Sequence, residues 1–189
     1  MSPRLPQTPL RSDARDNRDR ILEAARAIFA TEGLDVPMRE IARRAGVGPA
    51  TLYRRFPTKQ ALITEAFTEQ MYACYAIVDE GLADPDAWRG LRTVVERLFA
   101  LHAEDRGFAR AFTDTAARER GVVSLAELLR RAREAGHLRP DVTVDDLILV
   151  LVANSGLRAT AATTRVAASR RFAELTLRAL AATPDPARP

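Results

Sequence analysis

Residues 49–55 carry the side chains whose types and spacing could do chemistry. Thr51 and Tyr53 offer hydroxyl groups to phosphates or to base edges, and Pro49 or Ala50 can contact the methyl group of a thymine. A short helix that exposes these groups has the chemistry of a helix that reads the DNA major groove.

Basic residues surround this segment. Arg54 and Arg55 add charge and possible bidentate contacts to guanine, and Arg39 can reach a base or a phosphate. A lysine at a helix start is unfavourable for the helix dipole, so a nearby phosphate would explain Lys59. Arg43 and Arg44 flank the two helices. The candidate basic DNA contacts are Arg39, Arg44, Arg54, Arg55 and Lys59.

Two short helices, over 38–45 and 49–56, must position these groups. Gly46 permits the positive φ of a tight turn, and Gly48 with Pro49 forms a suitable N-cap and first helical position. This spacing predicts a helix-turn-helix motif at 37–56, the alternative being a small bundle with surface arginines. Its small core would come from Ile41, Ala45, Val47, Leu52 and Phe56.

Residues 18–67 resemble the DNA-binding domain of the TetR family of bacterial transcriptional regulators. The match rests on Ile21-Leu-Glu-Ala-Ala, Phe29 and Gly33, and above all on the run Ala45-Gly-Val-x-x-x-Thr-Leu-Tyr-x-x-Phe-x-x-Lys59. The chain departs from the family at Pro37-Met38, where many members have a threonine that would contact a phosphate. The resemblance implies phosphate contacts from Tyr53 and Lys59 and a phosphate or base contact from Thr51. It implies DNA contacts from Arg39, Pro49, Ala50, Thr51, Tyr53, Arg54, Arg55 and Lys59.

The charge distribution agrees with a basic module joined to a neutral one. Residues 1–60 hold 12 Lys and Arg against 7 Asp and Glu, whereas residues 61–189 hold 17 against 18. The 189 residues contain one cysteine, and their longest apolar run, 147–153, is too short to cross a membrane. With no apolar segment near the start, we expect a cytoplasmic protein without a membrane partner.

Helical periodicity and a scarcity of glycine predict an all-α chain of nine helices. We expect an arm at 1–14 and a tail at 183–189, both disordered. Between them we expect a three-helix DNA-binding domain at 15–60 and a helical ligand-binding and dimerisation domain at 61–182. The helices are expected near 16–31, 38–45, 49–56, 59–82, 86–102, 108–117, 122–135, 143–157 and 166–181.

The last two helices carry more leucine than one small bundle needs, so they are the candidate dimer interface; the alternative is that they complete the core of the subunit. The interface residues would be Leu147, Leu151, Leu157, Phe172, Leu175 and Leu180. A ligand pocket would draw on the middle helices, although such residues are more often core. Its candidates are Phe67, Met71, Tyr75, Trp88, Val95, Phe99, His102, Phe112, Leu125, Leu129 and Asn154.

An enzyme is not expected, because the only histidines, His102 and His137, lie far apart and no metal-ligand spacing or phosphate-binding loop occurs. No cofactor is expected. The sequence predicts a dimeric repressor that binds a palindromic operator in double-stranded DNA. A small apolar effector would tilt the helix that begins at Lys59 and release the DNA. The alternative is a DNA-binding regulator that needs no ligand.

Overall fold

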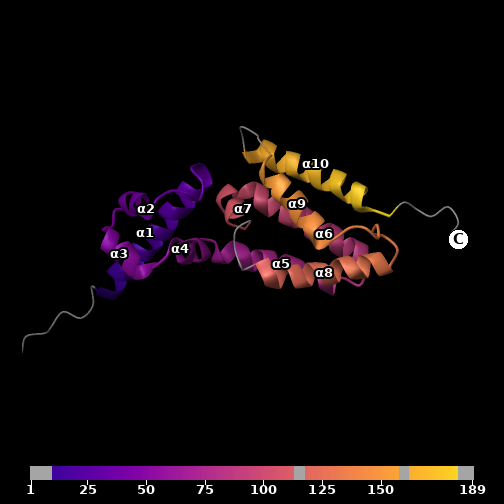
Figure 1. The fold of residues 1–189 in the computed structure, drawn as a ribbon, viewed down its shortest axis with the longest axis horizontal. Coiled ribbons are helices and arrows are strands. Elements are labelled where there is room, and N and C mark those ends of the chain that lie inside the picture. Colours follow the sequence, from indigo (N-terminus) through magenta and orange to yellow (C-terminus); the bar gives the residue numbers. More distant parts are fainter. Residues whose placement is uncertain (1–9, 113–117, 158–161, 183–189) are drawn as a thin grey trace, which may run out of the picture. The chain divides into compact units, whose positions relative to one another are not determined.

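The structure is a computed structural model that describes residues 10–112, 118–157 and 162–182. Within these ranges, side chains are described except at residues 10–14, 112, 118–120 and 162. The described residues form α-helices and one isolated bridge, between Leu138 and Ala181. The all-α prediction is confirmed (Figure 1). The helices are α1 Leu10–Thr31, α2 Met38–Ala45, α3 Pro49–Arg55, α4 Lys59–Ala66, α5 Thr68–Ala83, α6 Ala87–Glu104, α7 Arg106–Phe112, α8 Arg118–Glu134, α9 Val144–Ser155 and α10 Ala162–Leu180.

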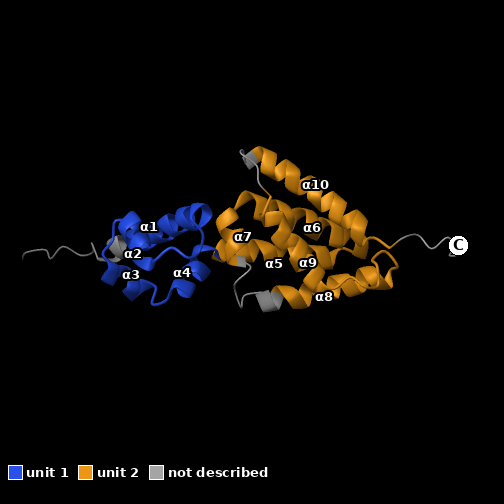
Figure 2. Cartoon of the chain, turned by 45° about the horizontal axis from the view of Figure 1, so that its top comes forward, with its two compact units in different colours: residues 1–67 blue, residues 68–189 orange. Residues whose placement is uncertain are grey.

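The chain divides into two compact units, with the boundary between Phe67 and Thr68 rather than at 60–61 (Figure 2). Unit 1 contains α1 to α4, and unit 2 contains α5 to α10. Within the described ranges no helix is both long enough and apolar enough to span a lipid bilayer.

The core of unit 1 follows the apolar stripe of α1, which packs against α2 and α4. Burial of a side chain at every third or fourth position is what an amphipathic helix achieves against its neighbours. Leu52 of α3 and Phe56, which directly follows that helix, are also fully buried. The buried residues of the stripe are Ile21, Leu22, Ala25, Ile28 and Phe29.

Unit 2 is built around α6, which packs against α5, α7, α8, α9 and α10. Its buried positions recur every three or four residues and form one broad face, whereas Arg89, Arg92 and Glu96 are exposed. In Figure 1, α8 (salmon) runs beside α5, and these two helices are in contact. Helix α6 is therefore the element that the other helices of unit 2 share as a packing partner.

The single helix expected over 59–82 is wrong, and this accounts for the tenth helix. Phe67 has φ −115° and ψ 18°, outside helical geometry, and separates α4 from α5. Its ring is buried in unit 1, 6.1 Å from the ring of Phe29. Burial of this large apolar group stabilises the interruption that pattern analysis cannot see.

Several helix starts also differ from the prediction, and α8 and α10 begin at Arg118 and Ala162, each four residues earlier than expected. Helix α1 begins at Leu10, inside the segment expected as a disordered arm, because no proline interrupts the chain between Pro9 and Pro37. Helix α6 begins at Ala87 and is capped by Asp86, whose carboxylate accepts the N–H of Arg89 at 2.9 Å. The remainder of the arm, the 113–117 end of the expected 108–117 helix and the tail lie outside the described residues.

Candidate nucleic-acid interface and apolar cavity

Local sequence explains the turn that joins α2 to α3. Gly46 adopts φ 65° and ψ 35°, a left-handed conformation that favours glycine. The N–H of Val47 then donates to the carbonyl of Ala42 at 3.0 Å, which closes the end of α2. Gly48 is the N-cap of α3, with Pro49 as its first residue. The predicted helix-turn-helix geometry is present.

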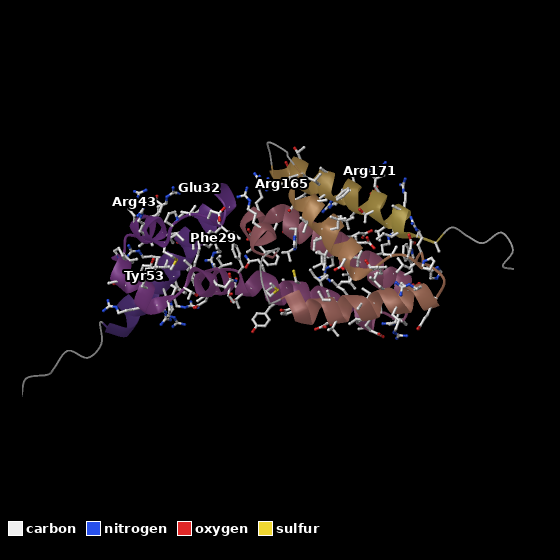
Figure 3. All side chains as sticks on the ribbon, viewed as in Figure 1. Phe29, Glu32, Arg43, Tyr53, Arg165 and Arg171 are labelled. Atoms are coloured by element: carbon white, nitrogen blue, oxygen red, sulfur yellow. The ribbon has the colours of Figure 1, made fainter. Side chains whose placement is uncertain are left out.

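Helix α3 turns its polar and basic residues away from the core of unit 1. Leu52 is buried, while Tyr53 keeps 50% of its surface exposed on the outer side of α3 (Figure 3). Thr51 is half-buried, and its hydroxyl accepts a hydrogen bond from Nη2 of Arg54 at 3.3 Å. The exposed residues of this helix are Pro49, Ala50, Tyr53, Arg54 and Arg55.

The arginines of α2 differ in how they are engaged. Arg44 forms ion pairs with Glu32 at 2.5 Å and with Glu40 at 2.9 Å, and Arg43 pairs with Glu40 at 2.6 Å. Hydrogen bonds from Arg43 and Arg44 lower the pKa of Glu40 to about 2. Arg39 is exposed and forms no ion pair with any described residue. Sequence reasoning passed over Glu40, although its spacing of three and four residues from two arginines signals the pairing.

The ends of α2 and α4 carry the remaining candidates. Pro37 is the N-cap of α2 and provides no side-chain hydrogen bond, which agrees with the missing threonine noted in the sequence. Thr58 caps α4 by accepting the N–H of Ala61 at 3.0 Å. Lys59 follows it, half-buried at the first position of α4. A cation at this position is not complemented by the helix dipole.

Unit 2 contains a partly open cavity of about 40 Å³ between α5, α6, α8 and α9. Its lining is apolar apart from the Cys74 thiol and the Tyr75 hydroxyl, and no charged side chain reaches it. Burial raises the pKa of Cys74 to about 12, so the thiol stays protonated. The lining residues are Cys74, Tyr75, Val78, Val94, Val95, Leu98, Phe99, Gly121, Val122, Leu125, Leu147, Ile148 and Leu151.

Four of the predicted pocket residues line this cavity: Tyr75, Val95, Phe99 and Leu125. The others lie elsewhere. Phe67 belongs to unit 1, and Trp88 lies beside His137 with ring centres 6.3 Å apart. The side chain of Phe112 lies outside the described residues. Met71, His102, Leu129 and Asn154 are placed in unit 2 but do not line the cavity.

Asn154 and His102 are buried polar residues of unit 2. The amide nitrogen of Asn154 donates to the carbonyl of Phe99 at 2.9 Å, and the Ser169 hydroxyl donates to the same carbonyl at 2.9 Å. These bonds attach α9 and α10 to α6. His102 lies against Phe108, with ring centres 5.2 Å apart, and burial lowers its pKa to about 4. Neither residue lines the cavity, and both take part in the packing of the helices of unit 2.

The candidate dimer residues divide into two groups. Leu147, Leu151 and Leu180 are buried inside unit 2, and the first two line the cavity, so they present no surface to a partner. This burial corrects their assignment, since helical spacing cannot tell a core face from an interface face. Leu175 keeps 47% of its surface exposed, and Leu157 and Phe172 are half-buried.

Across the described ranges, no group of three or more His, Cys, Asp or Glu side chains is placed to hold a metal ion.

Comparison with known proteins identifies both units. The family model described as bacterial regulatory proteins, tetR family, matches residues 21–66. The model for the C-terminal domain of SbtR-like transcriptional regulators matches residues 84–182, more than half of the chain.

Individual relatives agree with these matches. An HTH-type transcriptional regulator of Staphylococcus aureus is 36% identical over 74 residues, which cover 39% of this chain but only 34% of that protein. A TetR transcriptional regulator from Streptomyces coelicolor is 31% identical with a TM-score of 0.53, over 88% of this chain and 99% of that one. FadR from Bacillus subtilis, solved in complex with stearoyl-CoA, shares the fold at 20% identity, with a TM-score of 0.60, over 84% of this chain and 97% of that one. The chain belongs to the TetR family of bacterial transcriptional regulators.

Proposed function

We propose that this chain is a dimeric, sequence-specific DNA-binding repressor that a small apolar ligand releases from a palindromic operator. The observation that carries the proposal is the surface of α3. This helix buries Leu52 in unit 1 and exposes Tyr53, Arg54 and Arg55, while Arg39 extends the same basic region from α2. Hydroxyl and guanidinium groups on an exposed helix of a helix-turn-helix motif suit phosphates and base edges in the major groove.

Dimerisation is needed for a helix-turn-helix protein to read two half-sites, because the two recognition helices must lie about 34–36 Å apart. Exposed leucines on the last two helices support such an interface. Leu149 on α9 keeps 65% of its surface exposed, and Leu175 on α10 keeps 47%. A helix pair from each subunit would bury these side chains in a four-helix arrangement around a two-fold axis.

The cavity in unit 2 supports control by a ligand. A fully packed interior would favour the alternative regulator without a ligand, whereas an apolar space between the helices offers a place for one. Its lack of charged lining suits an uncharged hydrophobic molecule, and with a volume of about 40 Å³ it must widen to admit a ligand of more than a few atoms. The long acyl chain present in the FadR structure would need a much larger space than this one.

Helix α5 offers a route from the ligand to the DNA-binding unit. Cys74, Tyr75 and Val78 of α5 line the cavity, and the same helix follows α4 after the single residue Phe67. A ligand that displaces α5 would act on the chain at Phe67 and change the separation of the two recognition helices. A coupling free energy of about 1–3 kcal/mol between ligand and DNA is typical of such linkage.

The experiment is selection of bound duplexes from a random pool by the full chain, followed by a salt series on the selected duplex. We expect a two-fold symmetric consensus and a steep loss of affinity with salt. Salt-sensitive binding without a consensus would contradict sequence-specific recognition, and no binding would contradict the proposal as a whole.

Ligand response is tested on the same duplex with methane and xenon, apolar probes small enough for a space of about 40 Å³. We expect the probes to weaken DNA binding by the wild type but not by Leu151→Phe, because that substitution fills the cavity. Val123→Phe is the matched control, since Val123 lies on α8, another helix that lines the cavity, but its own side chain is exposed. Equal responses by the wild type and both variants would contradict binding in this cavity.

A further inference from the structure

Arg20 of α1 contacts the turn of the helix-turn-helix motif. Its Nη2 donates to the carbonyl of Ala45 at 2.7 Å and to the carbonyl of Gly46 at 3.1 Å. The two ends of this contact are 25 and 26 residues apart in the sequence. One guanidinium from the first helix therefore holds two successive peptide groups of the turn.

These carbonyls are ones that a helix cannot satisfy by itself. Ala45 is the last residue of α2 and Gly46 is its C-cap, so neither carbonyl has an N–H one turn further along the helix. The carboxyl end of a helix also carries partial negative charge. A cation that donates to both carbonyls satisfies their hydrogen-bonding capacity and complements the dipole, in a charge-assisted bond that is stronger than a neutral one.

Gly46 and Arg20 fit one another. A β-carbon at Gly46 would lie 2.5 Å from Nη2 of Arg20, closer than any carbon and nitrogen approach without bonding. The φ of 65° favours glycine at this position, and a β-carbon there would displace the end of the Arg20 side chain from its two carbonyls. The turn and the arginine form one unit of structure.

We propose that Arg20 is a positioning residue that fixes the recognition helix α3 relative to α2, and that it acts on DNA binding through the turn. Only Val47 and Gly48 separate its carbonyl contacts from Pro49, where α3 begins. Side chains that read base edges must be held to within about half an ångström of their working geometry. The inference rests on the proposed function, because it assigns the residue that orients the proposed DNA-reading helix.

A direct phosphate contact is the competing role for an exposed arginine. The main donor of Arg20, Nη2, is already engaged by two carbonyls, and Nη1 lies 3.4 Å from Oδ1 of Asn17. Arg55, in contrast, is exposed on α3 and forms no ion pair with the described part of the chain. The two roles differ in one measurable property, because loss of a phosphate contact reduces the salt dependence of binding.

The test compares Arg20→Gln with two matched variants in the full chain. Arg26→Gln removes another arginine of α1 that donates to a helix-end carbonyl, that of Ala66 at 3.2 Å, away from the turn. Arg55→Gln removes an exposed arginine of the recognition helix. Each variant is titrated with the duplex selected by the wild type over a series of salt concentrations. Hydrogen exchange of backbone amides over residues 46–53 is measured without DNA.

We expect Arg20→Gln to weaken binding about tenfold with an unchanged salt slope, and to speed exchange over 46–53. Arg26→Gln should change affinity by less than about twofold, and Arg55→Gln should reduce the salt slope by about one for each subunit. A reduced slope for Arg20→Gln would overturn the inference, as would an equal loss of affinity in Arg26→Gln. If the wild type selects no duplex, the proposed function fails. If the Arg20→Gln substitution left the hydrogen exchange of residues 46–53 unchanged, that result by itself would show that Arg20 does not hold the turn.

Discussion

A β-carbon placed on Gly90 would lie 2.3 Å from the carbonyl oxygen of Gly81, so α5 and α6 approach one another backbone to backbone. Gly81 is confined in the same way, because a β-carbon on it would lie 2.3 Å from Cγ2 of Val94 and 3.0 Å from the Gly90 carbonyl oxygen. Both glycines are buried. This crossing fixes the spacing of the two helices that line one side of the cavity.

Gly90→Ala should therefore destabilise unit 2 even though alanine is the better helix former. The intrinsic gain in a helix is about 1 kcal/mol, but the methyl group meets a backbone atom that cannot move without separating the helices. We expect a net loss of about 2 kcal/mol in the free energy of unfolding, measured by urea denaturation. Gly121→Ala is the control, because its nearest neighbour would be a ring carbon of Tyr75 at 3.9 Å. An equal effect of both substitutions would contradict the close crossing.

Local signals were sufficient to predict the DNA-reading region. The φ of Gly46, the N-cap at Gly48 and the burial of Leu52 all depend on residues within one turn of each other, and all were predicted correctly. The alternation of buried and exposed positions then places Tyr53 at the surface. Such features depend on short-range stereochemistry and on the helical periodicity of apolar residues, so they can be predicted from a single sequence.

Features that depend on tertiary contacts were not predictable in the same way. The break at Phe67 depends on burial against Phe29, which lies 38 positions earlier in the chain. Leu147 and Leu151 have helical spacing that fits an interface or a core equally well, and only the packed structure places them at the cavity. The hydrogen bond from Arg20 to the Gly46 carbonyl is another long-range contact, and nothing in the sequence spacing of these two residues indicates it.

His102 should make the protein less stable in mild acid. Burial lowers its pKa from 6.5 to about 4, so between these values the unfolded chain binds a proton that the folded chain does not. The free energy of unfolding should fall as pH decreases from about 6.5, by about 1 kcal/mol for each pH unit. Urea denaturation at pH 7 and pH 5 measures the difference.

The comparison variants for this prediction are His102→Gln and His137→Gln. The first should lose most of the change between pH 7 and pH 5, whereas the second removes an exposed histidine and should retain it. The Glu40 carboxyl, with a pKa of about 2, does not titrate in this range. An acid response that is the same in His102→Gln as in the wild type would assign the effect to other groups.

Cys74 should react slowly with thiol reagents while the protein is folded. Its pKa of about 12 leaves little thiolate at pH 8, and its side chain is buried beside the cavity. We expect reaction with 5,5′-dithiobis(2-nitrobenzoic acid) to be slower by a factor on the order of a hundred or more than in 6 M guanidinium chloride. Because the unfolded thiol ionises near pH 9, stability should also decrease above that pH. Equal rates with and without denaturant would show that the cavity opens freely.

Glu40 should limit the affinity of the basic surface for DNA. Its carboxylate pairs with both Arg43 and Arg44, and it places negative charge next to the residues proposed to approach phosphates. Glu40→Gln should free Arg43 and remove one of the two partners of Arg44, whose other partner is Glu32. We therefore expect tighter binding to a non-selected duplex and a salt slope that is steeper by about one for each subunit.

The matched control is Glu23→Gln, which removes the same charge from α1, where Glu23 is exposed and has no arginine partner among the described side chains. This variant should change the salt slope much less, because it releases no arginine. Fluorescence anisotropy with a labelled duplex at several salt concentrations measures both quantities. If Glu40→Gln and Glu23→Gln gave the same slope, the gain in affinity would come only from net charge. The ion pairs of α2 would then have no part in tuning the interface.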